Sequence, residues 1–263
     1  MMPEGIKFSV FALLCCVVFS VSMINSGQAY EPESILGVWL FDEEKGNEVL
    51  DSSEKGHNGT ITNIDVERVD GQFGEALSFV GGGKVTVPHA EDLVTPVFTL
   101  MTWIKVDDFT DAYQLIVGKD GWPNRNYGMF VQKDTGKLHF AFCSPVQQDA
   151  GNMNSNMVVT DGEWHHIAAT YDMAMEKIYI DGILDSTKQS AMEPSESTVD
   201  IEIGRSFVGI IDEVLIANEA FELDDIAKAM ELGLAEFIGG GAIVSASGKL
   251  TSTWGAIRSA AAN

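Results

Sequence analysis

Two adjacent histidines, His165 and His166, are the side chains of this sequence best suited to bind a metal ion or to transfer protons. They stand in DGEWHHIAATYD (161–172), whose alternating pattern is typical of a β-strand. On a strand the two rings point to opposite faces of the sheet, so they cannot hold one ion together. A zinc site would need further ligands. The other histidines are His57, His89 and His139, and Cys143 is the only thiol beyond residues 1–29. We therefore predict packing and hydrogen-bonding roles for this pair.

A second stretch, KDGWPNRNYG (119–128), has the composition of a sugar-binding loop. It combines an aromatic ring that can stack on a sugar with planar polar groups that can bind hydroxyls. The candidate ligand-binding residues are Trp122, Asn124, Arg125, Asn126 and Tyr127. The alternative is a Trp-Pro turn that packs on the body of the fold.

The N-terminal segment is typical of a secretory signal peptide. A single Lys7 precedes the apolar run SVFALLCCVVFSVS (9–22), which is too short to span a membrane, and small residues close the segment at Ala29. We expect residues 1–29 to be removed and the protein to be secreted, either to the extracellular space or to the periplasm. Cleavage would leave Cys143 as the only cysteine, so no internal disulfide is expected.

The charge balance excludes one class of partner. The chain has 16 Lys and Arg against 39 Asp and Glu, a formal net charge of −23. Such a surface repels nucleic acid and anionic lipid and attracts cations. We therefore expect no nucleic-acid binding.

The elements that must position these residues are short strands, followed by a single helix. Runs with period two are separated by Gly, Asn, Asp and Pro throughout residues 30–217. The predicted strands are 35–41, 76–80, 84–87, 98–106, 113–119, 127–132, 137–142, 164–171, 177–182, 200–204 and 208–217. An Asp-Gly pair at 181–182 predicts a two-residue hairpin turn.

The fold class that follows is all-β, a two-sheet antiparallel jelly-roll sandwich with a short C-terminal helix. Apolar residues at helical spacing predict that one amphipathic helix, at 221–238, closes a domain of residues 30–238. A glycine-rich joint then opens a tail of residues 239–263, whose role the sequence does not reveal.

Five motifs in order resemble the laminin-G-like and pentraxin-like modules of the concanavalin A-like lectin/glucanase superfamily, in their bacterial secreted form. They are GVWLFDEEKGNEVLDSSEKGHNGTI, GQFGEALSFVGGGKVTVP, FTLMTWIKV, DGEWHHIAATYD…KIYIDGILDS and GIIDEVLIANEAF. The resemblance covers roughly residues 35–235 and implies a jelly roll. The superfamily includes lectins, glycosidases, lyases and adhesion modules, so the fold alone does not settle the function.

The carboxylates do not form the catalytic set that glycosidases of this superfamily use. The family-16-type glycoside hydrolases of this superfamily carry Glu-x-Asp-x-Glu along one strand, which places the three acids on one face. Here Asp200 and Glu202 share a face, but Thr198 occupies the position of the first glutamate. Asp212 and Glu213 are adjacent and are expected on opposite faces. We predict a non-catalytic module that binds a glycan or an extracellular protein. The alternative is a glycan-active hydrolase or lyase with an unfamiliar set of acids.

The resemblance also implies a structural calcium ion, which takes oxygen ligands from side chains and backbone carbonyls. In the family the first strand and the last share this ion. Carried over, Asp42 and Asp212 would supply side-chain oxygens, and the Gly46–Asn47 turn would supply carbonyls. The alternative is that these acids are solvated turn residues. Asp51 looks like a turn-capping aspartate instead.

Overall fold

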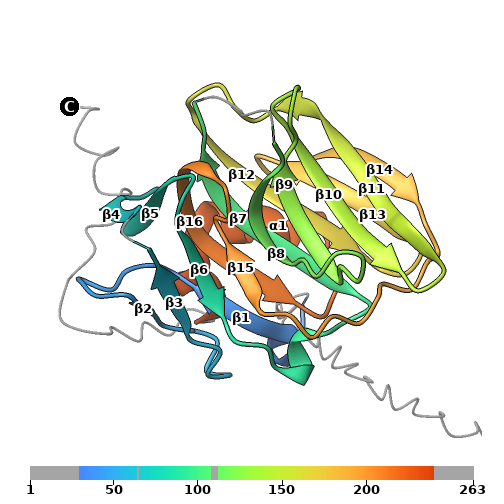
Figure 1. Cartoon of the computed structure of the whole chain (residues 1–263), viewed down its shortest axis with the longest axis horizontal. Coiled ribbons are helices and arrows are strands. Elements are labelled where there is room, and N and C mark those ends of the chain that lie inside the picture. Colours follow the sequence, from blue (N-terminus) through green and yellow to red (C-terminus); the bar gives the residue numbers. More distant parts are fainter. Residues whose placement is uncertain (1–29, 64, 108–111, 240–263) are drawn as a thin grey trace, which may run out of the picture.

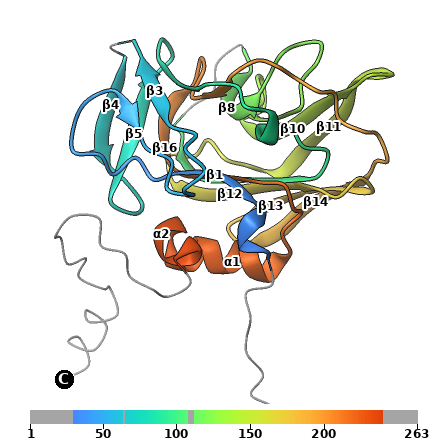
Figure 2. The same cartoon turned by 90° about the horizontal axis from the view of Figure 1, so that it is seen from below.

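The computed structural model describes residues 30–63, 65–107 and 112–239. The chain folds into two antiparallel sheets packed face to face, and two helices cover the outer face of one of them (Figures 1 and 2). The predicted signal peptide and residues 240–263 of the predicted tail lie outside the described residues. Within the described part, no helix is both long and apolar enough to cross a membrane.

Sheet A is the layer that lies between the other sheet and the helices (Figure 2). It consists of β1 (Ile35–Trp39), β4 (Val66–Asp70), β5 (Glu75–Val80), β7 (Phe98–Lys105), β12 (Trp164–Tyr171), β13 (Met175–Ile180), β14 (Ile183–Gln189) and β16 (Val208–Ala217). The order in space is β14–β13–β12–β7–β16–β5–β4, and β1 also pairs with β16. The first and last strands of the described residues, β1 and β16, are thus hydrogen-bonded neighbours.

Sheet B forms the opposite layer of the sandwich. It consists of β2 (Glu48–Val49), β3 (Gly59–Thr62), β6 (Lys84–Val87), β8 (Gln114–Lys119), β9 (Tyr127–Val131), β10 (Lys137–Ser144), β11 (Gln147–Val158) and β15 (Ile201–Ile203). The order in space is β11–β10–β9–β8–β15–β6–β3–β2. Short 3-10 helices at Pro32–Ser34 and Glu91–Leu93 complete the connections. The predicted all-β jelly-roll sandwich with C-terminal helical structure is confirmed.

The burial patterns follow from this layering. Strand β15 alternates, with Ile201 and Ile203 in the core and Glu202 facing outward, because one face of sheet B meets solvent. Strand β7 is buried at nearly every position, because sheet A has the sandwich core on one face and helices on the other. Leu100 joins the core between the sheets, while Met101 packs in the cluster beneath the helices.

The predicted single helix is in fact two, α1 (Leu223–Leu232) and α2 (Leu234–Ile238). Gly233 between them has φ 78° and ψ 155°, a conformation that is essentially restricted to glycine. A Cβ at this position would lie 2.8 Å from the ring of Phe73. The apolar spacing was still informative, because Ile226 and Phe237 are among the residues that pack on sheet A.

The prediction missed five of the described strands, β2, β3, β4, β11 and β14. The longest of them, β11, was missed because its sequence QQDAGNMNSNMV is polar and rich in asparagine. It lies at the edge of sheet B, where only alternate side chains such as Met153 and Ser155 need to be buried. The predicted hairpin is confirmed. Strands β13 and β14 are joined by Asp181 and Gly182, whose φ angles are 52° and 71°.

Candidate functional site

His165 and His166 occupy opposite faces of β12. The Nδ1 atom of His165 lies 2.9 Å from an oxygen of Asp181, and its Nε2 atom lies 3.1 Å from one of Asp161. Burial lowers the pKa of His165, but the hydrogen bonds and charges of these two carboxylates raise it by more, so the net shift is upward. His166 packs against Trp103 with ring centroids 5.2 Å apart, and burial lowers its pKa to about 3. The His165 ring therefore has a hydrogen-bonding role, and the His166 ring has a packing role.

Asp42 and Asp212 meet on either side of the loop that joins β4 to β5. An Asp42 oxygen accepts a 2.8 Å hydrogen bond from the Glu75 amide. An Asp212 oxygen accepts a 2.9 Å bond from the Phe73 amide. The tertiary structure therefore brings the two predicted metal ligands to one loop, although 170 positions separate them in the sequence.

Two glycines allow this loop to approach both carboxylates. A Cβ on Gly74 would lie 2.0 Å from an oxygen of Asp42, and one on Gly71 would lie 2.6 Å from an oxygen of Asp212. Sequence reasoning did not assign either glycine to the site. The available signal was the pair of glycines in DGQFGE (70–75), directly before a predicted strand.

The cluster holds more negative charge than its protein partners balance. Asp212 is fully buried, and its Oδ1 atom has no hydrogen-bond partner among the described residues. Burial raises the pKa of Asp212 to about 7, and Asp42 adds to the shift, against the Phe73 and Gln72 amides. The Oε2 atom of Glu75 is likewise buried without a partner within the described ranges.

A β-bulge brings Glu213 to the same side as Asp212, contrary to the expectation of opposite faces. Glu213 has φ 51°, and the register of β16 shifts between Asp212 and Leu215. Both oxygens of Glu213 accept from the Leu234 amide at 3.0 Å, which fixes the start of α2. Burial raises the pKa of Glu213 well above its usual range, and Asp212 adds to the shift.

The remaining predicted calcium residues contribute differently. Gly46 lies in an exposed turn with φ 93°, and the Asn47 carbonyl accepts a 2.7 Å bond from the Ile61 amide. This carbonyl therefore has one lone pair left for another partner. Asp51 caps a turn, since its oxygens accept from the amides of Val38, Ser53 and His57.

These features fit an oxygen-liganded cation that needs backbone as well as side-chain ligands. Among the described residues, no group of three or more His, Cys, Asp or Glu side chains converges as a metal site would require. Two carboxylates and unpartnered buried oxygens nevertheless match the oxygen ligands that calcium takes.

The predicted sugar-binding loop connects β8 to β9 and divides into an exposed and a buried part. Trp122 is 54 % exposed, and the Arg125 guanidinium lies 5.7 Å from its ring centroid. Asn124 is exposed as well. Asn126 and Tyr127 are buried and bond backbone groups, with the Tyr127 hydroxyl donating to Leu93, so they shape the loop from within. Among the five predicted residues, Trp122 and Asn124 are the exposed ones, whereas the Arg125 side chain is only 12 % exposed.

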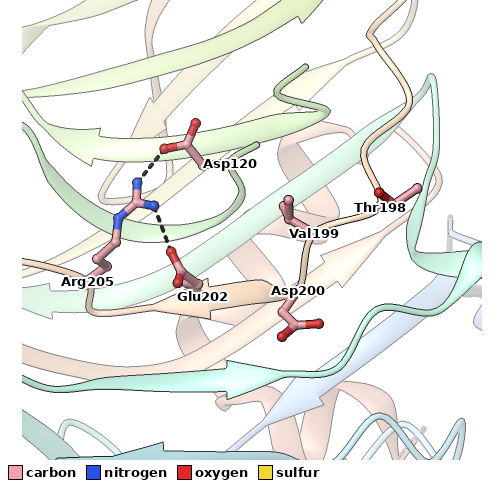
Figure 3. A pocket seen from close by; sticks show the side chains of 6 residues that line it. All are labelled: Asp120, Thr198, Val199, Asp200, Glu202 and Arg205. Carbon is pink, nitrogen blue, oxygen red and sulfur yellow. Dashed lines mark hydrogen bonds and ion pairs between the residues drawn. The ribbon is translucent and has the colours of Figure 1, made fainter. Parts of the chain in front are cut away.

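A pocket of about 420 Å³ adjoins this loop on the outer face of sheet B (Figure 3). Its lining residues are Asp120, Thr198, Val199, Asp200, Glu202 and Arg205. Asp120 precedes Trp122 by two positions and accepts a 2.7 Å bond from Arg125 Nε. Figure 3 shows Arg205 between Asp120 and Glu202, with Thr198, Val199 and Asp200 on the other side.

Buried polar contacts hold the wall of the pocket in place. The ammonium group of Lys119 is fully buried and donates to the Val199 carbonyl at 2.6 Å, and it lies 2.8 Å from His89 Nδ1. The His89 amide donates to Asp200 at 2.9 Å. Burial lowers the pKa of Lys119 to about 8, while Asp200 and Glu91 oppose the shift. The segment before β15 is thereby fastened to the end of β8.

The acids of the pocket do not resemble a free catalytic pair. Glu202 is engaged by cations on both oxygens, Lys84 on one and Arg205 on the other at 2.7 Å. Asp120 is shared between Arg125 and Arg205. Sequence reasoning missed Asp120 and Arg205, because nothing in their spacing relates β8 to the residues after β15.

The architecture defines the class of protein, a two-sheet antiparallel jelly-roll domain, which here carries a polar pocket on its surface. A family model described as the concanavalin A-like lectin/glucanases superfamily, of laminin G type, matches residues 79–227. The match covers more than half of the chain, which therefore belongs to this family. A comparison of the sequence with curated proteins found no match.

Solved structures share the fold at low sequence identity. The binding domain of Paraclostridial mosquitocidal protein 1 has a TM-score of 0.63 and 14 % identity over 76 % of this chain and 52 % of its own. Domain 4 of an extracellular arabinanase from Geobacillus stearothermophilus, in complex with arabinotriose, has a TM-score of 0.59 and 19 % identity, over 74 % of this chain and 97 % of its own. The binding domain of botulinum neurotoxin DC, in complex with rat synaptotagmin II, has a TM-score of 0.59 and 17 % identity, over 76 % of this chain and 52 % of its own. The chain thus spans about half the length of the toxin domains.

Proposed function

We propose that the protein is an exported, non-catalytic module that binds glycans through the β8–β9 loop and the adjoining pocket. The observation that carries this proposal is the position of Trp122. Its half-exposed ring stands on the loop that supplies Asp120 to a polar pocket of about 420 Å³. Protein sites for small ligands occupy roughly 300–1,000 Å³ and pair an apolar surface with a few fixed polar groups. One or two sugar rings fit this description.

The solved structures support a binding role without specifying the ligand. The arabinanase domain was solved with arabinotriose, and the neurotoxin DC domain was solved with SialylT and with synaptotagmin II. An exposed indole favours a glycan here, because a sugar ring can stack on its face. Recognition of an extracellular protein is the other outcome of the same test.

Binding of the intact protein to a polysaccharide panel tests this proposal. Trp122→Ala should weaken glycan binding at least about tenfold. The same substitution should change the free energy of unfolding by less than about 1 kcal/mol, because about half of the residue is exposed and its contact with the Arg125 guanidinium is weak. Leu50→Ala, which removes a 46 % exposed side chain from another loop, is the matched control. Glycan binding unchanged in Trp122→Ala would refute the site.

A glycan-active hydrolase or lyase remains the second candidate, because Asp200 and Glu202 line the same pocket. The panel should therefore also be assayed for released reducing ends. Release that is lost in both Asp200→Ala and Glu202→Ala would establish the enzyme and end the non-catalytic proposal. Binding without release supports the module.

We also propose a structural calcium ion at the cluster around the β4–β5 loop. Asp42 and Asp212 would hold it with side-chain oxygens, and the Gly46–Asn47 turn would supply carbonyls. The unpartnered, fully buried oxygen of Asp212 supports the proposal, since a cation would satisfy that oxygen. When bound, calcium would neutralise charge and tie the end of β1 to β16.

Export rests on the predicted signal peptide, with cleavage after Ala29. Tyr30, the residue that follows, is buried, stacks on Phe237 at 4.5 Å and donates its hydroxyl to the Phe237 carbonyl. A mature chain that begins at Tyr30 would keep these contacts. N-terminal sequencing of the exported protein should read Tyr-Glu-Pro.

A further inference from the structure

We infer that the pocket beside Trp122 selects an uncharged sugar unit and rejects sugars that carry a carboxylate, sulfate or phosphate. This inference rests on the proposed glycan-binding function and specifies its ligand class. It follows from how the charges of the pocket are paired and from which polar groups remain available to a ligand.

The charges at the pocket cancel one another. Arg205 sits between Asp120 and Glu202, donating to Glu202 at 2.7 Å. The second oxygen of Glu202 is held by Lys84, and the second oxygen of Asp120 is held by Arg125 at 2.7 Å. Asp200 interacts with the buried ammonium group of Lys119, which Glu91 also compensates. Four carboxylates thus stand against four cations, so no net positive charge is left to attract an anion.

The free hydrogen-bonding groups match hydroxyls. A guanidinium has five N–H donors, and the described contacts of Arg205 use only part of them while its side chain stays 38 % exposed. Asp200 uses one oxygen for the His89 amide, which leaves the other as an acceptor. Thr198 contributes a hydroxyl and Val199 an apolar surface. Donors and acceptors around an apolar wall suit a polyol.

The overall charge of the protein also disfavours acidic sugars. The net charge of −23 creates a negative potential that repels acidic glycans over distances set by ionic strength. A neutral sugar is not affected by this field. Its binding should therefore be insensitive to salt, in contrast to an anion held by an exposed arginine.

The experiment measures the affinity of the full exported chain for pairs of oligosaccharides by calorimetry. Each pair has a neutral member, with arabinotriose among them, and an acidic member that ends in a uronic or sialic acid. We expect the neutral member to bind at least about tenfold more tightly. Its affinity should change less than about twofold between about 0.02 and 0.5 M NaCl.

Two variants locate the selectivity in the pocket. Asp200→Asn keeps an oxygen for the His89 amide but replaces the free acceptor with a donor, and it should weaken binding of the neutral sugar about tenfold. Glu202→Gln leaves Arg205 and Lys84 less compensated, so it should raise the affinity for the acidic member. Glu193→Gln, an equal change of charge at an exposed residue outside the pocket lining, should do neither.

The results distinguish a failure of selectivity from a failure of glycan binding. Failure to bind any glycan overturns the proposed function and this inference with it. Binding of the acidic member as tightly as the neutral one, with strong weakening by salt, overturns the selectivity and leaves glycan binding standing. Neutral binding that survives Asp200→Asn unchanged, in a variant whose melting curve matches the wild type, removes the pocket from recognition.

Discussion

Calcium binding by the Asp42–Asp212 cluster predicts a specific dependence of stability on pH. In the metal-free protein, burial raises the pKa of Asp212 from 3.8 to about 7. Between these values the folded state binds more protons than the unfolded state, so the free energy of unfolding falls as pH rises. Above the folded pKa the loss is complete, and a shift of this size corresponds to about 4 kcal/mol. Glu213, whose pKa is also raised, acts in the same direction.

Calcium should remove most of this loss, because it binds the ionised carboxylates and satisfies the buried oxygen of Asp212. A chain of this size shifts its melting temperature by roughly 2–4 °C per kcal/mol. At pH 5, which already lies above the unfolded pKa of 3.8, part of this loss has occurred, so about 2.6 kcal/mol of it falls between pH 5 and pH 8. Chelated protein should therefore melt on the order of 5–10 °C lower at pH 8 than at pH 5. With excess calcium the difference should shrink, since a ligand a hundredfold above its Kd adds about 2.7 kcal/mol.

The assay is thermal unfolding at pH 5 and pH 8, each with calcium or with a chelator. Asp212→Asn should lose both the calcium response and most of the pH dependence. Asp51→Ala is the control. It removes three turn-capping hydrogen bonds and should lower stability while keeping the calcium response. Melting curves of the wild type that coincide with and without calcium at pH 8 would show that the site is absent. A chelated wild type whose pH profile matches Asp212→Asn would refute the assigned pKa.

Two further predictions concern the helical layer and β12. Gly233→Ala should lower the free energy of unfolding by about 2–5 kcal/mol, because alanine must adopt a glycine-only conformation and its Cβ collides with the Phe73 ring. Gly56→Ala, at φ 85° with open space around it, should lower it by about 1–2 kcal/mol. Chemical denaturation of both variants measures the difference. His165, whose pKa is raised, stabilises the fold fully below its unfolded pKa of about 6.5, and this contribution is lost as pH rises through the folded pKa. The stability advantage of the wild type over His165→Gln should therefore be larger at pH 5.5 than at pH 8, and an advantage that grows with pH would contradict the ion-pair assignment.

Local patterns in the sequence were enough for the fold class. Period-two runs predicted most of the strands of both sheets, and the Asp-Gly pair at 181–182 predicted its turn, because alternation and turn chemistry act over a few residues. Strand β11 escaped because an edge strand buries so little that its composition stays polar. The break at Gly233 escaped because it depends on the ring of Phe73, which is distant in the sequence.

The sites show the same division. From the sequence alone, alternation along one strand predicted that His165 and His166 face apart, and the acidic composition predicted that nucleic acid is not a partner. Only the tertiary structure showed that Asn126 and Tyr127 turn inward, and that a bulge carries Glu213 to the side of Asp212. Only the pairing of β15 with β6 and β8 brings Arg205, Asp120 and Lys84 to one pocket. The physical reason is that side-chain direction within an element follows from local backbone geometry. The partners of a side chain across a sandwich depend instead on strand order and register, which the packing of the whole chain decides.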